Sequence, residues 1–369
     1  MLLKLSAKAK WNLRQILPFG IIWLVIGWIF MTVEYAATGN QSFQPEEAIK
    51  LSLPVLVFAS IAVFLVGIVI GVFEVIFFND LFSREKFSIR IFSKLFVYGT
   101  ALLFIIVITY PIAASLELGL PLYHARVWVK LAGFLGSVVF LSTMFQMAFS
   151  LFLCFIYYGI SQHLGHGALI NFFTGRYNDP IEENRIFMFL DMRHSTRAAE
   201  KLGNKRYYEL LSDYYSDFSD AIVNCRGEVY QYIGDEVVIT WESEQGLKNN
   251  NAIECFYQMK KSMHKRSEYY LQKYDFVPHF KAGLHCGQVT TGEIGALKKE
   301  VFFIGDVLNV TARIQSLCNE YQQELLISNT FLEASDAQDL YDVDSLGSIH
   351  LKGRKEPIEL YSLSELIIS

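Results

Sequence analysis

Four long apolar stretches dominate the first half of this 369-residue chain, at about 16–34, 54–78, 95–114 and 131–156. Each has roughly 20 residues or more, enough for a helix to cross about 30 Å of hydrocarbon. Four in succession favour membrane-spanning helices over buried helices of a soluble protein, and the first is too long for a cleaved signal peptide. The sequence therefore predicts a four-span transmembrane domain over residues 1–158.

Basic residues beside these spans predict their orientation. Cytoplasmic loops carry an excess of Lys and Arg, so the two most basic segments and both chain termini are expected in the cytoplasm. No span carries a charged residue well inside its core, which disfavours a transporter and favours an anchor, dimeriser or sensor in the cell membrane. The basic residues are Lys4, Lys8, Lys10 and Arg14 before the first span, and Arg84, Lys86, Arg90 and Lys94 between the second and third.

A linker over residues 159–183 separates this domain from a second half of different character. Its segment "GALINFFTGRY" is compatible with either an amphipathic juxtamembrane helix or a plain connector, and Asp179-Pro180 ends it. The net charge of the chain is -5, so nothing indicates a nucleic-acid partner. The five cysteines are odd in number and form no C-x-x-C pair, which favours a reduced compartment.

The second half alternates between strand and helix patterns. "RIFMFLDM" (185–192) indicates a buried strand, and the helical segment after it carries a stripe of paired tyrosines that favours helix packing. The hairpin "GEVYQYIGDEVVITW" (227–241), a helix over about 248–272, the alternating "HFKAGLHCGQVTTGEIG" and the strand-helix segment "VFFIGDVLNVTARIQSLCN" follow. The order βαββαβ predicts an α+β ferredoxin-like domain.

Two aspartates of this half are expected to lie close together. Asp191 ends the first strand, and Asp235 lies in the turn of the hairpin that neighbours that strand. Each alone has an ordinary interpretation, as a helix cap and as a turn residue. Two close carboxylates repel each other unless they share a proton or a cation. Oxygen ligands suit Mg²⁺ or Mn²⁺, so the pair points to two-metal phosphoryl or nucleotidyl transfer.

Three motifs in order, "FMFLDMRHST", "YQYIGDEVV" and "IGDVLNVTAR", resemble the catalytic core of class III nucleotidyl cyclases. The resemblance covers about 184–363, includes a later "LKG", and implies a cyclase catalytic domain over 184–369. It implies that Asp191 and Asp235 bind two Mg²⁺ (or Mn²⁺) ions, that Asn309 orients the ribose and that Arg313 stabilises transition-state charge. Asn309 and Arg313 are four residues apart, on one helix face. The residues matching phosphate contacts are Lys352 and the backbone of Met192, Arg193, His194, Ser195 and Thr196.

Several positions depart from the pattern of that family. In the family, two positions recognise the purine base. The first is commonly Lys and is Gln231 in this chain, and the second is commonly Asp or Thr and is Phe302 in this chain. A Gln amide can pair with adenine or guanine, and Phe can only pack on a base. His194 and Ser195 replace a frequent Gly-Phe in the phosphate loop. We expect ATP as substrate, because adenylate cyclases dominate bacterial-looking chains of this family, with GTP as the alternative.

The resemblance implies a membrane-anchored adenylate cyclase that forms cyclic AMP and pyrophosphate as a homodimer. In the family the metal aspartates come from one subunit and the Asn/Arg pair from its partner, and a membrane anchor would raise the effective concentration of the subunits. The alternatives are a guanylate cyclase, a non-catalytic receptor or scaffold, and a diguanylate cyclase. The segment "IGDEVV" resembles the Gly-Gly-Asp-Glu-Phe hairpin of diguanylate cyclases, but it has Ile233 in place of the first Gly. We expect Glu236 to be solvated rather than a third ligand. Core or edge roles are expected for His279, His285 and Cys286, which have no ligand spacing.

Overall fold

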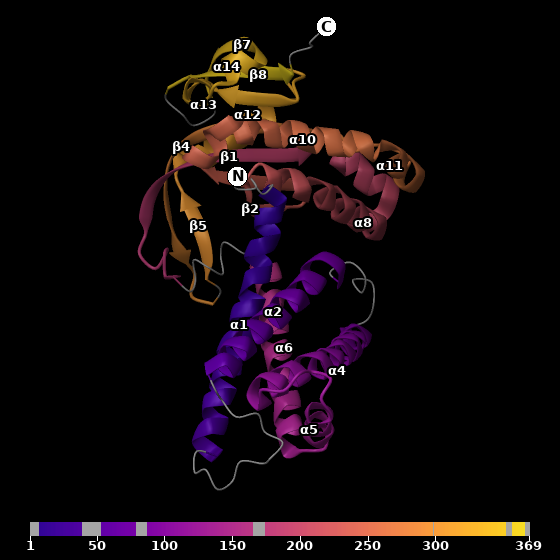
Figure 1. Ribbon diagram of the computed structural model, residues 1–369. Coiled ribbons are helices and arrows are strands. Elements are labelled where there is room, and N and C mark those ends of the chain that lie inside the picture. Colours follow the sequence, from indigo (N-terminus) through magenta and orange to yellow (C-terminus); the bar gives the residue numbers. More distant parts are fainter. Residues whose placement is uncertain are drawn as a thin grey trace. The chain divides into compact units, whose positions relative to one another are not determined.

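The computed structural model describes residues 7–38, 53–78, 87–164, 174–297, 299–351 and 356–365. The chain divides into two compact units, one formed by Ala9–Leu169 and the other mainly by Ile170–Ser369. Long helices make up the first unit, and a sheet with helices makes up the second (Figure 1). The predicted fold class, four apolar helices followed by an α+β domain, is confirmed.

Within the described residues, four helices are long and apolar enough to cross a membrane: Lys8–Val33, Leu53–Phe77, Phe96–Leu118 and Val138–Gln162. Their outer faces expose large apolar side chains such as Phe104 and Phe145, a pattern typical of helices in contact with lipid. The helices of this unit are α1 (Ala7–Thr38), α2 (Leu53–Val72) with a π-helical continuation (Phe73–Phe78), α4 (Phe87–Leu118), α5 (Ala125–Leu135) and α6 (Val138–Leu164).

The fourth apolar stretch is divided in a way that its hydropathy alone did not indicate. Residues 131–135 belong to α5, and a new helix, α6, starts at Val138. The Ser137 hydroxyl accepts a hydrogen bond from the Phe140 amide at 3.2 Å, which caps the new helix. The fourth candidate span is therefore displaced toward the C-terminus, to Val138–Gln162.

A buried ion pair lies near the end of the second candidate span. Glu74 in the π-helical segment is 1% exposed and accepts hydrogen bonds from the Lys94 ammonium and, at 2.7 Å, from the Tyr98 hydroxyl. Lys94 Nζ also lies 5.6 Å from the centre of the Phe155 ring. Lys94 was counted above as a loop cation, but it belongs to α4. These contacts connect α2, α4 and α6 through one charged cluster.

The second unit is built on a mixed sheet whose strand order is β2-β3-β1-β4-β6-β8-β7, with β5 paired to β4. Its first four strands have the neighbours expected of a βαββαβ domain, so this prediction is confirmed. The strands are β1 (Ile181–Met192), β2 (Glu228–Ile233), β3 (Glu236–Glu242), β4 (Phe280–Ile294), β5 (Glu300–Ile304), β6 (Leu325–Ser328), β7 (Tyr341–Ile349) and β8 (Ile358–Glu365). The helices are α8 (Ser195–Asn224), α9 (Ser243–Leu247), α10 (Asn251–Lys265), α11 (Ser267–Tyr274), α12 (Asp306–Leu317), α13 (Asn329–Ala334) and α14 (Ala337–Leu340).

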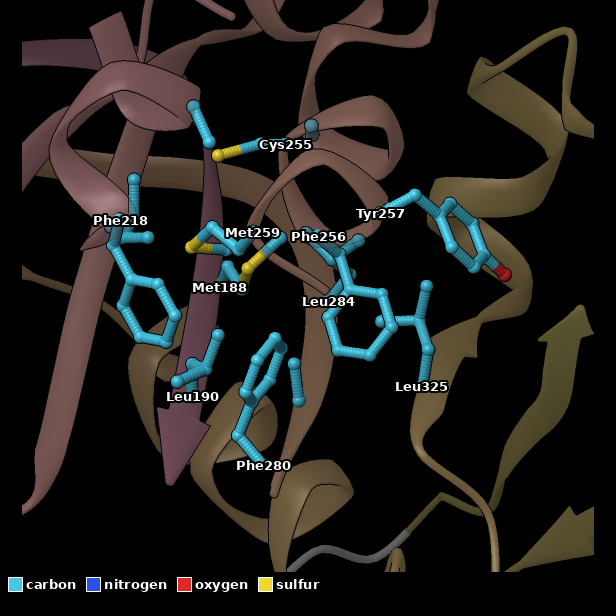
Figure 2. Packing of buried hydrophobic residues seen from close by; sticks show 14 of the residues in the cluster. Met188, Leu190, Phe218, Cys255, Phe256, Tyr257, Met259, Phe280, Leu284 and Leu325 are labelled. Carbon is cyan, nitrogen blue, oxygen red and sulfur yellow. The ribbon is translucent and has the colours of Figure 1, made fainter. Parts of the chain in front are cut away.

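The main core fills the space between one face of this sheet and helices α8 and α10. Met188 and Leu190 of β1 pack there with Phe218 of α8 and with Phe256 and Met259 of α10 (Figure 2). All five side chains are almost fully buried. Because side chains alternate along a strand, the odd-numbered residues of β1 must point to the opposite face.

Helix α12 covers that opposite face. Phe187 and Phe189 of β1 pack there with Val307 of α12. Helix α12 crosses β4 so closely at Gly283 that a Cβ atom added to Gly283 would lie 2.5 Å from the backbone nitrogen of Gln315. Only glycine permits this approach, so Gly283 determines where α12 sits on the sheet.

Four further sequence expectations concern the second unit and the segment that precedes it. The single helix predicted over about 248–272 is two helices, α10 and α11, which meet at Arg266. The tyrosine stripe of α8 is mainly a packing surface, because Tyr214 is fully buried. His285 is buried and bonded to Ser328 Oγ at 2.7 Å, as a core residue would be. Most of "GALINFFTGRY" (167–177) lies outside the described residues.

Candidate active site

Asp191 lies near the end of β1, on the face of the sheet opposite the main core. Its neighbour Met192 belongs to that core, so the Asp191 side chain points the other way. Across the strand pair it faces Lys281 of β4, whose ammonium nitrogen lies 3.4 Å from Asp191 Oδ2. Lys281 is nearly buried, with 7% of its side chain exposed. The carboxylate is therefore held beside a desolvated cation.

Asp235 lies beside Asp191 because the β2–β3 hairpin ends there. Gly234 and Asp235 form the two-residue turn, since Ile233 pairs with Glu236, and β3 pairs with β1 up to Leu190 and Val237. The backbone of Gly234 is left-handed (φ 65°), a conformation that glycine adopts without strain. A tight turn at this register places the second acid at the same sheet edge as the first, as the sequence predicts.

The two carboxylates are near enough to influence each other's charge. Burial and then the neighbouring Asp191 raise the pKa of Asp235 to about 6, and a hydrogen bond from the Ser195 hydroxyl partly opposes this rise. The pKa of Glu236 is also raised, by burial first and then by Asp191 and Asp235. Glu236 is half-buried, so it is less solvated than expected. The edge is a patch of excess negative charge that Lys281 only partly offsets.

This arrangement fits a divalent cation. Asp235 Oδ2 is buried and has no hydrogen-bond donor, and Asp191 cannot supply one while it is ionised. Among the described residues, no group of three or more His, Cys, Asp and Glu side chains forms a metal site. Proteins nevertheless commonly bind Mg²⁺ through only one or two carboxylates when substrate phosphates complete the coordination. The acids therefore suit a cation that arrives with a phosphate ligand.

A pocket of about 370 Å³ opens beside Asp191, around the turn from β1 to α8. The amides of Ser195, Thr196 and Arg197 in the first turn of α8 have no intrahelical acceptor, and with the helix dipole they favour an anion. The predicted phosphate-loop residues do line this pocket. The lining residues are Asp191, Met192, Arg193, His194, Ser195, Thr196, Lys281 and Asn319.

The turn itself is firmly held despite its unusual sequence. The Arg193 amide donates to the His279 carbonyl at 2.7 Å, and the Arg193 guanidinium donates to the Gln323 carbonyl at 2.6 Å. His194, which stands where glycine is frequent, is left-handed (φ 58°, ψ 29°). Histidine is among the residues that tolerate this region, so the replacement preserves the turn at some cost in backbone strain.

Asn309 and Arg313 lie outside this pocket. Both are on α12, whose buried side is formed by residues such as Val310 and Ile314. Asn309 is exposed and Arg313 is half-buried. Because they are one helical turn apart, they form a polar pair on the outer side of the helix. Within one chain, the Asn/Arg pair therefore does not line the pocket beside Asp191.

The sequence of this domain matches a known family over residues 179–365, the adenylate and guanylate cyclase catalytic domain. The chain belongs to this family. The resemblance identified from the three motifs is thus confirmed, and the two acids and the pocket lie within the matched cyclase domain.

Known cyclases resemble the chain over this region. Adenylate cyclase 2 of Rhizobium meliloti (strain 1021) is 30% identical over 205 residues, which is 56% of this chain and 56% of the relative. The adenylate cyclase of Anabaena cylindrica is 24% identical over 182 residues, 48% of this chain and 36% of the relative. The chain thus spans about half or less of the length of these curated relatives. A solved structure of a bacterial light-regulated adenylyl cyclase shares the fold, with a TM-score of 0.51 and 21% identity over 59% of this chain and 64% of that one.

The two positions that read the purine in the cyclase family also lie outside the pocket. Gln231 is exposed on the edge strand β2, and Phe302 on β5 is 40% exposed. Strands β2 and β5 approach each other over one face of the sheet, as shown by the rings of Tyr230 and Phe303, whose centres lie 4.9 Å apart. Gln231 and Phe302 are therefore held on neighbouring segments of the same chain. Lys352 lies outside the described residues.

Two lining residues of the cyclase pocket, Lys281 and Asn319, were not among the predicted site residues. Lys281 had a recognisable signal in the sequence, because it is the only charged residue in "FKAGLHC", a run of consecutively buried strand positions. A lysine there needs an anionic partner. Asn319 follows the end of α12, and no local pattern distinguishes it from an ordinary turn residue.

Proposed function

We propose that this chain is a membrane-anchored adenylate cyclase that converts ATP to 3′,5′-cyclic AMP and pyrophosphate. The observation that carries the proposal is the pair of neighbouring carboxylates Asp191 and Asp235, of which Asp191 lines a pocket formed by a helix N-terminus and a buried lysine. Membership of the cyclase family narrows the chemistry of such a site to nucleotide cyclisation. The curated relatives above are named as adenylate cyclases, which favours ATP.

Asp191 and Asp235 are the residues that would hold two Mg²⁺ or Mn²⁺ ions. Bound divalent ions would lower the pKa of the ribose 3′-hydroxyl and offset the charge of the triphosphate. The first-turn amides of α8 and the Lys281 ammonium would bind phosphate oxygens. The 3′-hydroxyl loses its proton, its oxygen forms a bond to the α-phosphorus, and the bond from that phosphorus to the bridging oxygen breaks. Pyrophosphate is then the leaving group.

A second copy of the chain would complete each site. Asn309 and Arg313 are absent from the pocket lining and project from the outer side of α12. In a symmetric dimer this pair can reach the partner's acids, where Asn309 would orient the ribose and Arg313 would stabilise the charge on the reacting phosphate. Gln231 and Phe302 would contact the base. We therefore propose a homodimer with two shared sites.

The four apolar helices would anchor this dimer in the cell membrane. The basic segments predicted to be cytoplasmic would put the cyclase domain on the side of the membrane where ATP is abundant.

The decisive experiment is a product assay on the full-length chain in lipid nanodiscs. The protein is incubated with α-labelled ATP or GTP and Mn²⁺, and the products are separated. We expect cyclic AMP as the main product and loss of turnover to background in Asp191→Ala and Asp235→Ala. The exposed Asp339 on α14 provides a matched control, and Asp339→Ala should keep wild-type turnover. Cyclic GMP as the main product would make the chain a guanylate cyclase, and no product from either nucleotide would favour the scaffold. Wild-type rates in the Asp191 variant would refute the metal assignment.

A further inference from the structure

Tyr215 of α8 contacts the turn that carries Asp235. Its hydroxyl donates a hydrogen bond to the Gly234 carbonyl at 2.9 Å, and the Glu236 carbonyl lies 3.4 Å from the same oxygen. Its ring packs against Tyr232 of β2, with the ring centres 4.4 Å apart. Tyr215 is half-buried, so this contact is partly shielded from water. The tyrosine therefore touches the hairpin on both sides of the acid.

This contact opposes two influences that would move the turn. The turn lies beyond the last paired residues of β1 and β3, Leu190 and Val237, so no backbone pairing with β1 holds it. The Asp235 carboxylate also lies against Asp191, and like charges push the tip of the hairpin away from β1. Tyr215 holds the peptide groups on either side of Asp235 and so anchors the backbone of the turn to α8.

We infer that Tyr215 is a positioning residue for Asp235: its hydroxyl fixes the hairpin turn so that the two carboxylates stay at the separation a divalent cation requires. The inference rests on the proposed function, because it assumes that these acids bind a cation. This inference gives Tyr215, one of the paired tyrosines of α8, a role besides packing. The packing role belongs to Tyr214, which is fully buried next to it.

Tyr215→Phe tests this role, because it removes the hydroxyl and keeps the ring on Tyr232. Mn²⁺ binding to the full-length chain in nanodiscs is measured by electron paramagnetic resonance, with a non-hydrolysable ATP analogue present. Loss of one hydrogen bond predicts Mn²⁺ affinity about 5- to 10-fold weaker than in the wild type. Turnover should return to within about twofold of wild type at saturating Mn²⁺, because the reacting groups are unchanged. Tyr208→Phe on the same helix is the matched control, since Tyr208 is 75% exposed, and it should bind Mn²⁺ as the wild type does.

A second variant keeps the inference testable if Tyr215→Phe folds poorly. Gly234→Ala leaves the tyrosine in place but strains the turn, since alanine disfavours φ 65°, and it should weaken Mn²⁺ binding in the same direction. Wild-type Mn²⁺ affinity in Tyr215→Phe, together with lost binding in Asp235→Ala, would overturn this inference and leave the proposed function intact. A low turnover that high Mn²⁺ does not restore would also overturn it. Unchanged Mn²⁺ binding in Asp235→Ala would instead refute the proposed function.

Discussion

At the scale of single residues, the candidate site is a group of charges that do not balance. Asp191, Asp235 and the half-buried Glu236 share one sheet edge with the buried cation Lys281. Tyr215 on α8 donates a hydrogen bond to the turn that carries Asp235, and Lys281 offsets only part of the negative charge. A site of this kind is unstable by itself and gains stability from a cationic ligand.

Replacing one acid should therefore stabilise the cation-free protein. The folded state raises the pKa of Asp235 from about 3.8 to about 6, so ionisation of this group costs free energy in the folded state. That destabilisation is absent below about pH 4 and complete above about pH 6. We expect Asp235→Asn to increase the free energy of unfolding by about 1 kcal/mol at pH 7.5, after allowance for partial exposure, and to change it little at pH 4.

The measurement is thermal unfolding of the full chain in detergent with EDTA at both pH values. Asp339→Asn, at an exposed position, should show no gain at either pH. An equal gain at pH 4 and pH 7.5 for the Asp235 variant would contradict charge repulsion as its cause.

The proposed role of Gln231 in purine choice can be tested, although Gln231 does not line the pocket beside Asp191. Gln231 can pair with adenine or guanine, because its amide both donates and accepts. Gln231→Lys supplies only donors and restores the residue common in the family, so we expect the ratio of kcat/KM for ATP over GTP to rise about tenfold. Competition assays with both nucleotides measure this ratio, and an unchanged ratio would mean that Gln231 does not face the base.

At the scale of elements, the positions of the helices depend on a few close contacts. Gly283 lets α12 lie directly on β4, and this sets where Asn309 and Arg313 emerge. In the unit of apolar helices (Ala9–Leu169), the buried pair Glu74 and Lys94 connects the end of α2 to α4. Such a pair adds little net stability relative to apolar residues, but it penalises any packing in which one partner is left alone.

The Glu74–Lys94 pair allows a test of packing in the unit of apolar helices. Lys94→Met leaves the Glu74 carboxylate buried without its cation and should lower the free energy of unfolding by about 3 kcal/mol. The double variant Glu74→Gln, Lys94→Met removes the charge and should recover most of the loss, since Tyr98 can still donate to the amide. Loss of helical circular dichroism on heating in detergent measures both. A double variant no more stable than the single one would contradict the ion-pair explanation.

At the scale of the whole molecule, one chain carries all the proposed site residues without assembling them. Asp191 and the phosphate loop line one pocket and Asp235 lies next to Asp191, whereas Asn309, Arg313, Gln231 and Phe302 do not line that pocket. We propose that a second copy of the chain completes the site, and a membrane anchor would favour the encounter by confining both copies.

Complementation between two inactive variants tests the shared site. In a mixed dimer of Asp191→Ala and Asn309→Ala chains, one site carries both defects and the other carries neither. Random pairing of equal amounts makes about half of the dimers mixed, so we expect about one quarter of wild-type cyclic AMP production. Each variant alone should be inactive. No recovery, with mixed dimers demonstrated by two affinity tags, would contradict a site formed by two chains.

Much of this molecule was predictable from local sequence patterns. Long apolar runs specify helices suited to a bilayer whatever surrounds them, and strand and helix periods gave the βαββαβ order. Asp191 and Asp235 could be placed together because one ends a strand and the other occupies the turn of the neighbouring hairpin. Both positions follow from strand pairing, which a short sequence segment determines.

Only the tertiary structure determined the features that depend on residues far apart in the chain. Lys281 lies beside Asp191 although 90 positions separate them in the sequence, and Lys94 is buried against Glu74 rather than exposed in a loop. The positions of Asn309 and Arg313 depend on how α12 crosses Gly283. Local patterns carry no record of such contacts, because their energies arise only when distant segments exclude water from one another.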